Sequence, residues 1–162
     1  DSLAGVLPTI RSRCISFAVA PVSPEDCARY CTAQGVGAKD AALYSALFDG
    51  HIGTVLAAAR DEARREQVDR ALALAKAAAA RDSYAAAVLL AAYEKDKAGA
   101  SALLADFRAV AAAGLRDSPH SPVEGETARK ALGAADAAMQ QISAQVNPKI
   151  VLSVLAAKFR TF

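Results

Sequence analysis

Alanine is the residue that most limits how this chain can fold, because it fills one long segment after another. Alanine has the highest helix propensity of the natural residues but adds little apolar area when it is buried. The hydrophobic fraction of 54% therefore overstates the volume of the core, and aromatic residues make up only 6%. Such a composition favours closely packed helices, and 162 residues are enough for one domain or two small ones. We expect an all-α fold.

Capping residues and helix breakers divide most of the chain into helices. Ser23-Pro24, for example, combines an N-cap residue with proline at the first helical position. We expect a small bundle of three short helices from residue 23, followed by a longer bridging helix at 61–80. About five further helices are expected in residues 81–162.

Three finer expectations concern the second half of the chain. Helical spacing places Tyr84 and Val88 on a buried helix face. An interruption at residues 95–99 is expected to delay the start of the next helix to Ser101. Residues 117–125, rich in serine, proline and glycine, are expected to form a mobile loop.

Residues 15–19 alternate apolar and small side chains, which is typical of a β-strand. A single strand cannot satisfy its own backbone hydrogen-bonding groups, and no second strand is apparent. The chain also lacks an initiator methionine. We therefore expect a piece of a longer protein, whose upstream part supplies the partner strands.

Charge and composition limit the function classes. A net charge of +2 is too small to indicate binding to nucleic acid or membrane by itself, and no apolar run approaches the ~20 residues of a membrane span. Three cysteines cannot close a complete disulfide framework, which favours a reducing, cytoplasmic location. No glycine-rich phosphate loop is present, so the chain is not expected to hold a nucleotide or another cofactor by itself.

The side chains with metal-binding or acid–base chemistry are few. Cys27 and Cys31 are spaced one helical turn apart, but the two further ligands that a zinc site needs are missing. We predict no metal site and expect both cysteines to be buried. His51 and His120 have no nucleophile or carboxylate partner that the sequence places beside them, and the alternating charges of residues 60–70 are typical of a solvated helix face.

The segment Leu7-Pro8-Thr9-Ile10-Arg11-Ser12-Arg13-Cys14 is different in kind. Pro8 suits the first position of a helical turn, and Arg11 and Arg13 flank Ser12 with little acidic sequence nearby. Paired arginines suit a phosphate or carboxylate partner, whereas the alternative is a solvated, positively charged turn. The residue types alone favour neither.

This segment resembles the Ser-Arg-Cys motif of the clamp-loader AAA+ family, in its bacterial DNA polymerase III form. In that family the motif precedes the last strand of the ATPase sheet, as it precedes residues 15–19 here. Residues 47–56 resemble the glycine-containing helix segment of the family's lid domain. Residues 115–117 and Asn147-Pro148 resemble the collar domain more weakly.

The resemblance implies three parts and one catalytic group. Residues 1–22 would be a remnant of the AAA+ ATPase domain, residues 23–80 a helical lid domain, and residues 81–162 a collar domain for oligomerisation. Arg13 would act as an arginine finger in trans, on ATP bound by a neighbouring subunit. The neighbours in the motif would support it: Thr9, Arg11, Ser12 and Cys14, with Cys14 as a small buried contact.

Gly53 decides which subunit type the resemblance favours. In the ATP-hydrolysing gamma and tau subunits the lid segment reads Gly-Ser-Leu-Arg, and the arginine senses that subunit's own nucleotide. Gly53 occupies this position here and cannot contact a phosphate through a side chain. The resemblance therefore favours the non-hydrolysing delta prime type, which would not be an enzyme on its own.

A delta prime subunit would join gamma/tau and delta subunits in a hetero-pentamer. Through that complex it would act on the sliding clamp and primer–template DNA during replication, without a membrane. Two alternatives stay open at this point: a gamma/tau-type subunit that hydrolyses ATP, and a helical adaptor unrelated to ATPases.

Overall fold

The computed structural model describes residues 7–15, 17, 20 and 22–162, and across these residues the chain is all-α, as predicted. Residues 16, 18 and 19 of the predicted strand lie outside this described part, so the strand stays a prediction. The α-helices are α1 (Pro8–Arg11), α2 (Pro24–Ala33), α3 (Ala38–Leu47), α4 (Ile52–Arg60), α5 (Glu62–Ala79), α6 (Ser83–Ala91), α7 (Lys97–Leu115), α8 (Gly125–Ser143) and α9 (Pro148–Lys158), and the 3-10 helix η2 (Phe159–Thr161) follows.

Short polar side chains begin most of these helices. The Ser23 hydroxyl accepts a hydrogen bond from the Asp26 amide at 3.1 Å, and Pro24 occupies the first turn of α2. The Asp61 carboxylate accepts from the amide of Ala63 at 3.0 Å at the start of α5. Such caps satisfy amides that have no partner within the helix, each stabilising by about 1 kcal/mol. The same role falls to Asp82, Asp96 and Asn147 at α6, α7 and α9.

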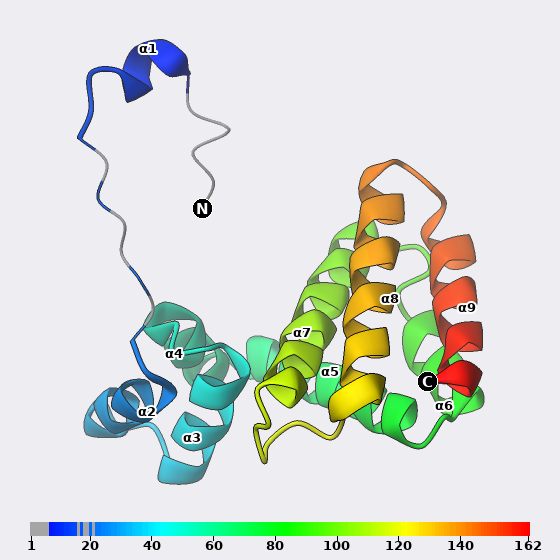
Figure 1. The fold of residues 1–162 in the computed structure, drawn as a ribbon, viewed down its shortest axis with the longest axis horizontal. Coiled ribbons are helices and arrows are strands. Elements are labelled where there is room, and N and C mark those ends of the chain that lie inside the picture. The colour runs from blue at the N-terminus through cyan, green and yellow to red at the C-terminus, as the bar shows by residue number, and fades with distance from the viewer. Residues whose placement is uncertain (1–6, 16, 18–19, 21) are drawn as a thin grey trace.

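Helices α2, α3 and α4 follow the N-terminal segment, which ends at residue 22, and pack against one another (Figure 1). Their shared core is small, and Tyr44 is its largest buried side chain. The other buried members are mostly short: Cys27, Cys31, Ala41, Leu47, Val55 and Ala58. Helix α5 continues from α4 and contacts α6 and α7 as well.

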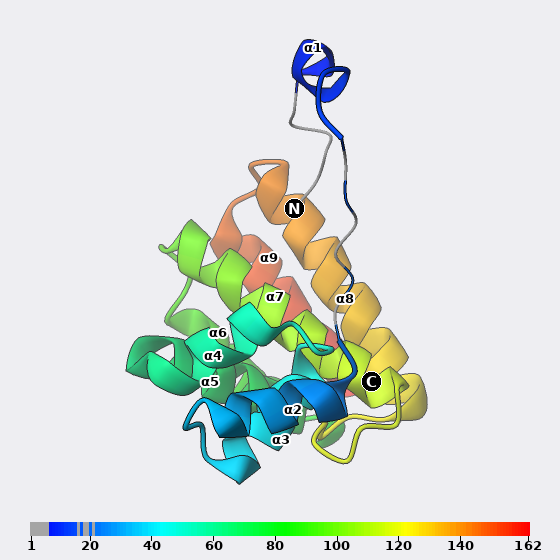
Figure 2. The ribbon, with the colours of Figure 1, turned by 90° about the vertical axis from the view of Figure 1, so that its left-hand side faces the viewer.

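Helix α7 is the centre of the rest of the fold, because it packs against α3, α5 and α8 (Figures 1 and 2). Among the described residues, α7 is also the helix whose length and composition alone would allow it to cross a membrane. Helices α6 and α9 pack on each other, and α9 also contacts α8. Phe107 of α7 stacks on Phe159, with ring centroids 5.8 Å apart. The ring centroids of Phe159 and Phe162 are 4.7 Å apart.

Two expectations for this half are wrong. Helix α7 begins at Lys97 instead of Ser101, because the Asp96 carboxylate accepts a hydrogen bond from the Gly99 amide at 2.9 Å and draws Gly99 into the first turn. Tyr84 and Val88 are exposed, at 78% and 57%. Helix α6 is apolar on every side, so its spacing does not single out the face that is buried.

Residues 117–124 form a loop, as predicted, while Gly125 already begins α8, and the loop packs on α7. Val123 is buried, and the Ser121 hydroxyl lies 2.9 Å from the carbonyl oxygen of Val110. Gly114 makes this approach possible, because a Cβ there would lie 2.0 Å from the carbonyl oxygen of Val123.

Candidate functional site

Residues 8–14, which we call the arginine turn, form the single helical turn α1 followed by a bend. Pro8 stands at the first position of α1, and the amide of Ser12 donates to the carbonyl oxygen of Pro8 at 2.9 Å. The amide of Arg13 donates to the carbonyl oxygen of Ile10 at 3.0 Å, and the Ser12 hydroxyl donates to that of Thr9 at 3.2 Å. Arg13 therefore follows directly on a turn closed by its own hydrogen bonds. Thr9 and Ser12 take part in that closure.

The turn stands clear of the helical body in both ribbon views (Figures 1 and 2). Thr9, Ser12, Arg13 and Cys14 are all exposed, so the expectation that Cys14 is a buried contact is wrong. In the described part of the chain no carboxylate pairs with Arg13. The side chain of Arg11 lies outside the described residues. An exposed guanidinium offers donors in a planar fork that matches phosphate or carboxylate oxygens.

Gly53 lies in the first turn of α4, far along the chain from the arginine turn. A Cβ at Gly53 would meet no atom within 4 Å, so packing does not require glycine there. The residue borders an open hollow of about 360 Å³ that also includes Val22, Gly50 and Thr54. The structure places this position next to the base of the N-terminal segment. It does not place it beside Arg13.

The two helix cysteines and the two histidines lie in different surroundings. Cys27 and Cys31 are fully buried, as predicted, and burial followed by the neighbouring Cys27 thiol raises the pKa of Cys31. The Nδ1 atom of His51 lies 2.8 Å from the carbonyl oxygen of Phe48, which ties the ring to the turn before α4. His120 is half-buried in the loop on α7. Across the described residues, no three potential metal ligands cluster.

The charged residues at 60–70 are exposed as predicted, apart from the half-buried Arg64, but three of the arginines also bond groups elsewhere in the fold. Arg60 donates to the carbonyl oxygen of Gln34 at 3.2 Å, and Arg70 bonds the Tyr93 hydroxyl at 3.0 Å. Arg64 pairs with Asp106 of α7 through two hydrogen bonds. Sequence reasoning missed this pair, although an aspartate within the apolar stripe of α7 was a signal that it needed a cationic partner.

A second link that the sequence did not reveal joins α7 to the turn between α3 and α4. Arg116, at the end of α7, donates to the carbonyl oxygen of Ala46 at 3.2 Å. Its Nε atom lies 3.6 Å from a carboxylate oxygen of Asp49. The two partners are 70 and 67 residues away along the chain, a separation that helical periodicity cannot relate.

No family model, curated protein or solved structure matches this chain. The exposed arginine turn and the motif that it carries are the features of this chain that point to a function.

Proposed function

We propose that this chain is the lid and collar part of a clamp-loader subunit of bacterial DNA polymerase III, of the non-hydrolysing delta prime type. The observation that carries the proposal is the exposed Arg13, held at the end of a self-closed turn within the motif Ser12-Arg13-Cys14. A cationic group that the described part of its own chain leaves unpaired is available to a neighbouring molecule.

Arg13 would act on ATP bound by an adjacent gamma/tau subunit. During phosphoryl transfer, negative charge is spread over the equatorial oxygens of the transferred group and over the leaving oxygen. A guanidinium presented from outside stabilises that charge, and arginine fingers of related nucleotide hydrolases accelerate turnover by ~10³–10⁵. The neighbouring subunit would supply the phosphate loop and the metal ion, so this chain would need no cofactor.

The remaining helices would hold the turn in place relative to the neighbour. Residues 23–80 would form the lid and residues 81–162 the collar that joins gamma/tau and delta subunits in a cytoplasmic hetero-pentamer. Gly53 supports the non-hydrolysing assignment. Because the space around it is open, a longer side chain is not excluded there by packing. Gly53 therefore differs from the phosphate-sensing arginine of gamma/tau subunits in its chemistry, and packing does not force that difference.

The experiment uses the full-length protein reconstituted with gamma/tau and delta subunits, sliding clamp and primed DNA. We expect Arg13→Ala to assemble normally but to lose most DNA-stimulated ATP hydrolysis. Arg13→Lys should recover little, because an ammonium group lacks the planar fork. Arg160→Ala, which removes another exposed arginine, is the matched control and should leave turnover unchanged.

Two outcomes would contradict the proposal. Unchanged ATP hydrolysis with Arg13→Ala would remove the finger assignment. Failure of the wild-type protein to bind any clamp-loader subunit would favour the helical adaptor instead.

A further inference from the structure

The N-terminal segment and the end of α7 both contact the turn between α3 and α4. The backbone reverses through two residues with positive φ, Asp49 at 52° and Gly50 at 73°. The amide of Gly50 donates to the carbonyl oxygen of Ser45 at 3.1 Å, and that of His51 to Phe48 at 3.1 Å. These bonds make residues 48–51, which we call the α3–α4 turn, a defined structure.

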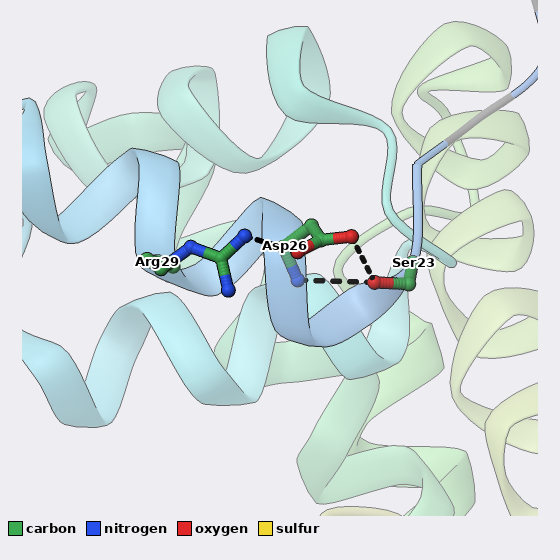
Figure 3. A network of polar contacts seen from close by, with 3 residues as sticks. All are labelled: Ser23, Asp26 and Arg29. Atoms are coloured by element: carbon green, nitrogen blue, oxygen red, sulfur yellow. Dashed lines mark hydrogen bonds and ion pairs between the residues drawn. The ribbon is translucent and has the colours of Figure 1, made fainter.

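On one side, this turn packs against the base of the segment that carries Arg13. A Cβ at Gly50 would lie 1.7 Å from the carbonyl oxygen of Val22, so only glycine permits this contact. Val22 immediately precedes the cap of α2, where Ser23 bonds both the amide and the carboxylate of Asp26 (Figure 3). Val22 therefore lies against Gly50 on one side and directly before the N-cap of α2 on the other.

On the other side, two arginines attach the α3–α4 turn to α7. Arg116 reaches Ala46 and Asp49, as described above. The Arg64 guanidinium lies 5.4 Å from the centre of the Phe48 ring while it pairs with Asp106. The two attachments differ in exposure: the side chains of Arg116 and Asp49 are 40% and 54% exposed, whereas that of Asp106 is only 6% exposed. An exposed ion pair contributes little to stability and its groups exchange readily with water. Breaking a buried pair is costly, because one charge is left without a partner away from water.

We propose that Arg116 is a positioning residue that couples the end of α7 to the base of the N-terminal segment. Arg116 bonds the end of α3 at Ala46 and pairs with Asp49 of the α3–α4 turn, and Gly50 of the turn packs against Val22. A displacement of the end of α7 would therefore reach Val22, at the base of that segment. Because the Arg116 contact is half-exposed, it can be released while the buried Arg64–Asp106 pair remains intact. The catalytic consequence of this coupling rests on the function proposed above for Arg13, but the coupling itself does not.

The coupling is tested first in the 162-residue chain by NMR. Arg116→Ala should accelerate hydrogen exchange at the Gly50 and His51 amides by roughly three- to tenfold, because a charged hydrogen bond is lost. It should also shift the amide resonances of Val22 and Ser23. Asp49→Asn should have a smaller effect in the same direction, since it removes the charge but tolerates the positive φ.

Arg108→Ala is the matched control. Arg108 lies on the same helix and forms an ion pair of similar exposure, with Asp136 at 2.6 Å, but it links α7 to α8. It should leave all four amides unchanged. Unaltered exchange in Arg116→Ala, or an equal response in Arg108→Ala, would overturn the coupling.

The second test uses the reconstituted clamp loader. Arg116→Ala should lower kcat for ATP hydrolysis without weakening subunit assembly, and Arg116→Lys should recover part of it by pairing with Asp49. An unchanged kcat, in a complex where Arg13→Ala lowers it, would overturn the positioning role. If wild-type protein fails to support hydrolysis at all, the proposed function fails, and the exchange measurement still decides the coupling.

Discussion

Arg64 of α5 and Asp106 of α7 form a two-pronged ion pair, in which Nη2 of the arginine lies 2.6 Å from Oδ1 of the aspartate. Among the described residues, Asp106 is the buried carboxylate. Its neighbours on α7 include the buried Leu103 and Phe107, which can offer it no hydrogen bond. The hydrogen bond to Asp106 raises the pKa of Arg64, so the arginine stays charged wherever the protein is folded. The Arg64 guanidinium therefore compensates the charge of the buried Asp106 carboxylate.

Removing Arg64 should therefore be costly. We expect Arg64→Ala to lower the free energy of unfolding by about 2–4 kcal/mol, somewhat below the usual cost of breaking a buried pair, because the Arg64 side chain keeps 23% exposure. Urea unfolding measures this loss. The double variant Arg64→Met with Asp106→Leu should recover most of it, since no unpaired charge remains. Arg108→Ala should cost less than about 1 kcal/mol. Equal losses for Arg64→Ala and Arg108→Ala would show that the pair is not effectively buried.

The local start and stop signals of the helices could be predicted from the sequence, but the faces they bury could not always be. Ser23-Pro24 begins α2, as predicted, because a short polar acceptor and a proline satisfy the first turn locally. The interruption expected at residues 95–99 does not extend past Asp96, because the Asp96 cap overrides the poor helix propensity of Gly99.

The candidate site was predictable only as a motif. Residue types identify the arginine turn around Arg13, and the structure adds that the turn is exposed. The links of Arg64 and Arg116 to distant elements depend on how the helices pack. Charge alternation describes one helix face at a time and cannot identify such partners.

Two glycines within long helices should respond in opposite directions to alanine. Gly133→Ala in α8 should stabilise by about 0.5–1 kcal/mol, because the new Cβ would meet nothing within 4 Å and alanine favours the helix. Gly114→Ala in α7 should destabilise by about 1–3 kcal/mol, because its Cβ would collide with the backbone at Val123. Thermal unfolding of both variants checks the prediction. Stabilisation by Gly114→Ala would show that the loop is not seated on α7.

Stability should fall in alkaline solution. Burial, followed by the nearby Asp40 and Asp69, raises the pKa of Tyr44 above its ordinary 10.0, and burial raises that of Cys31 above 9.0. The unfolded chain therefore loses these protons first. The stability they contribute is complete below about pH 9 and declines as the pH rises through the folded pKa values, by at most about 1.4 kcal/mol per pH unit for each group.

Urea unfolding at pH 8 to 11 measures this decline. Cys31→Ala should flatten it above pH 9, and Tyr44→Phe should flatten it above pH 10. Tyr84→Phe is the control, because that side chain is exposed and its removal should leave the slope unchanged. A wild-type stability that stays constant to pH 11 would contradict the prediction.

The three thiols should differ sharply in reactivity. Cys14 is exposed, whereas Cys27 and Cys31 are buried and become accessible only when α2 opens. With a disulfide reagent we expect one thiol to react at once and two to react more slowly by on the order of 10² or more, since buried groups wait for an opening event. Cys14→Ser should abolish the rapid phase and retain the slow one. Two rapid thiols in the native protein would show that α2 is not stably packed.

Buried alanines allow α7 and α8 to pack closely. Helices α7 and α8 pack on each other, and each carries fully buried alanines, including Ala100 and Ala111 of α7 and Ala131 and Ala135 of α8. The spacing of two packed helices follows the size of the side chains between them. Any larger residue there would push the helix axes apart and displace the Arg116 end of α7. Exposed side chains that make no contact can change size without moving these helices, whereas the buried alanines leave no room for a larger residue. At these positions the smallest apolar side chain of the sequence is also the one with the least freedom to vary.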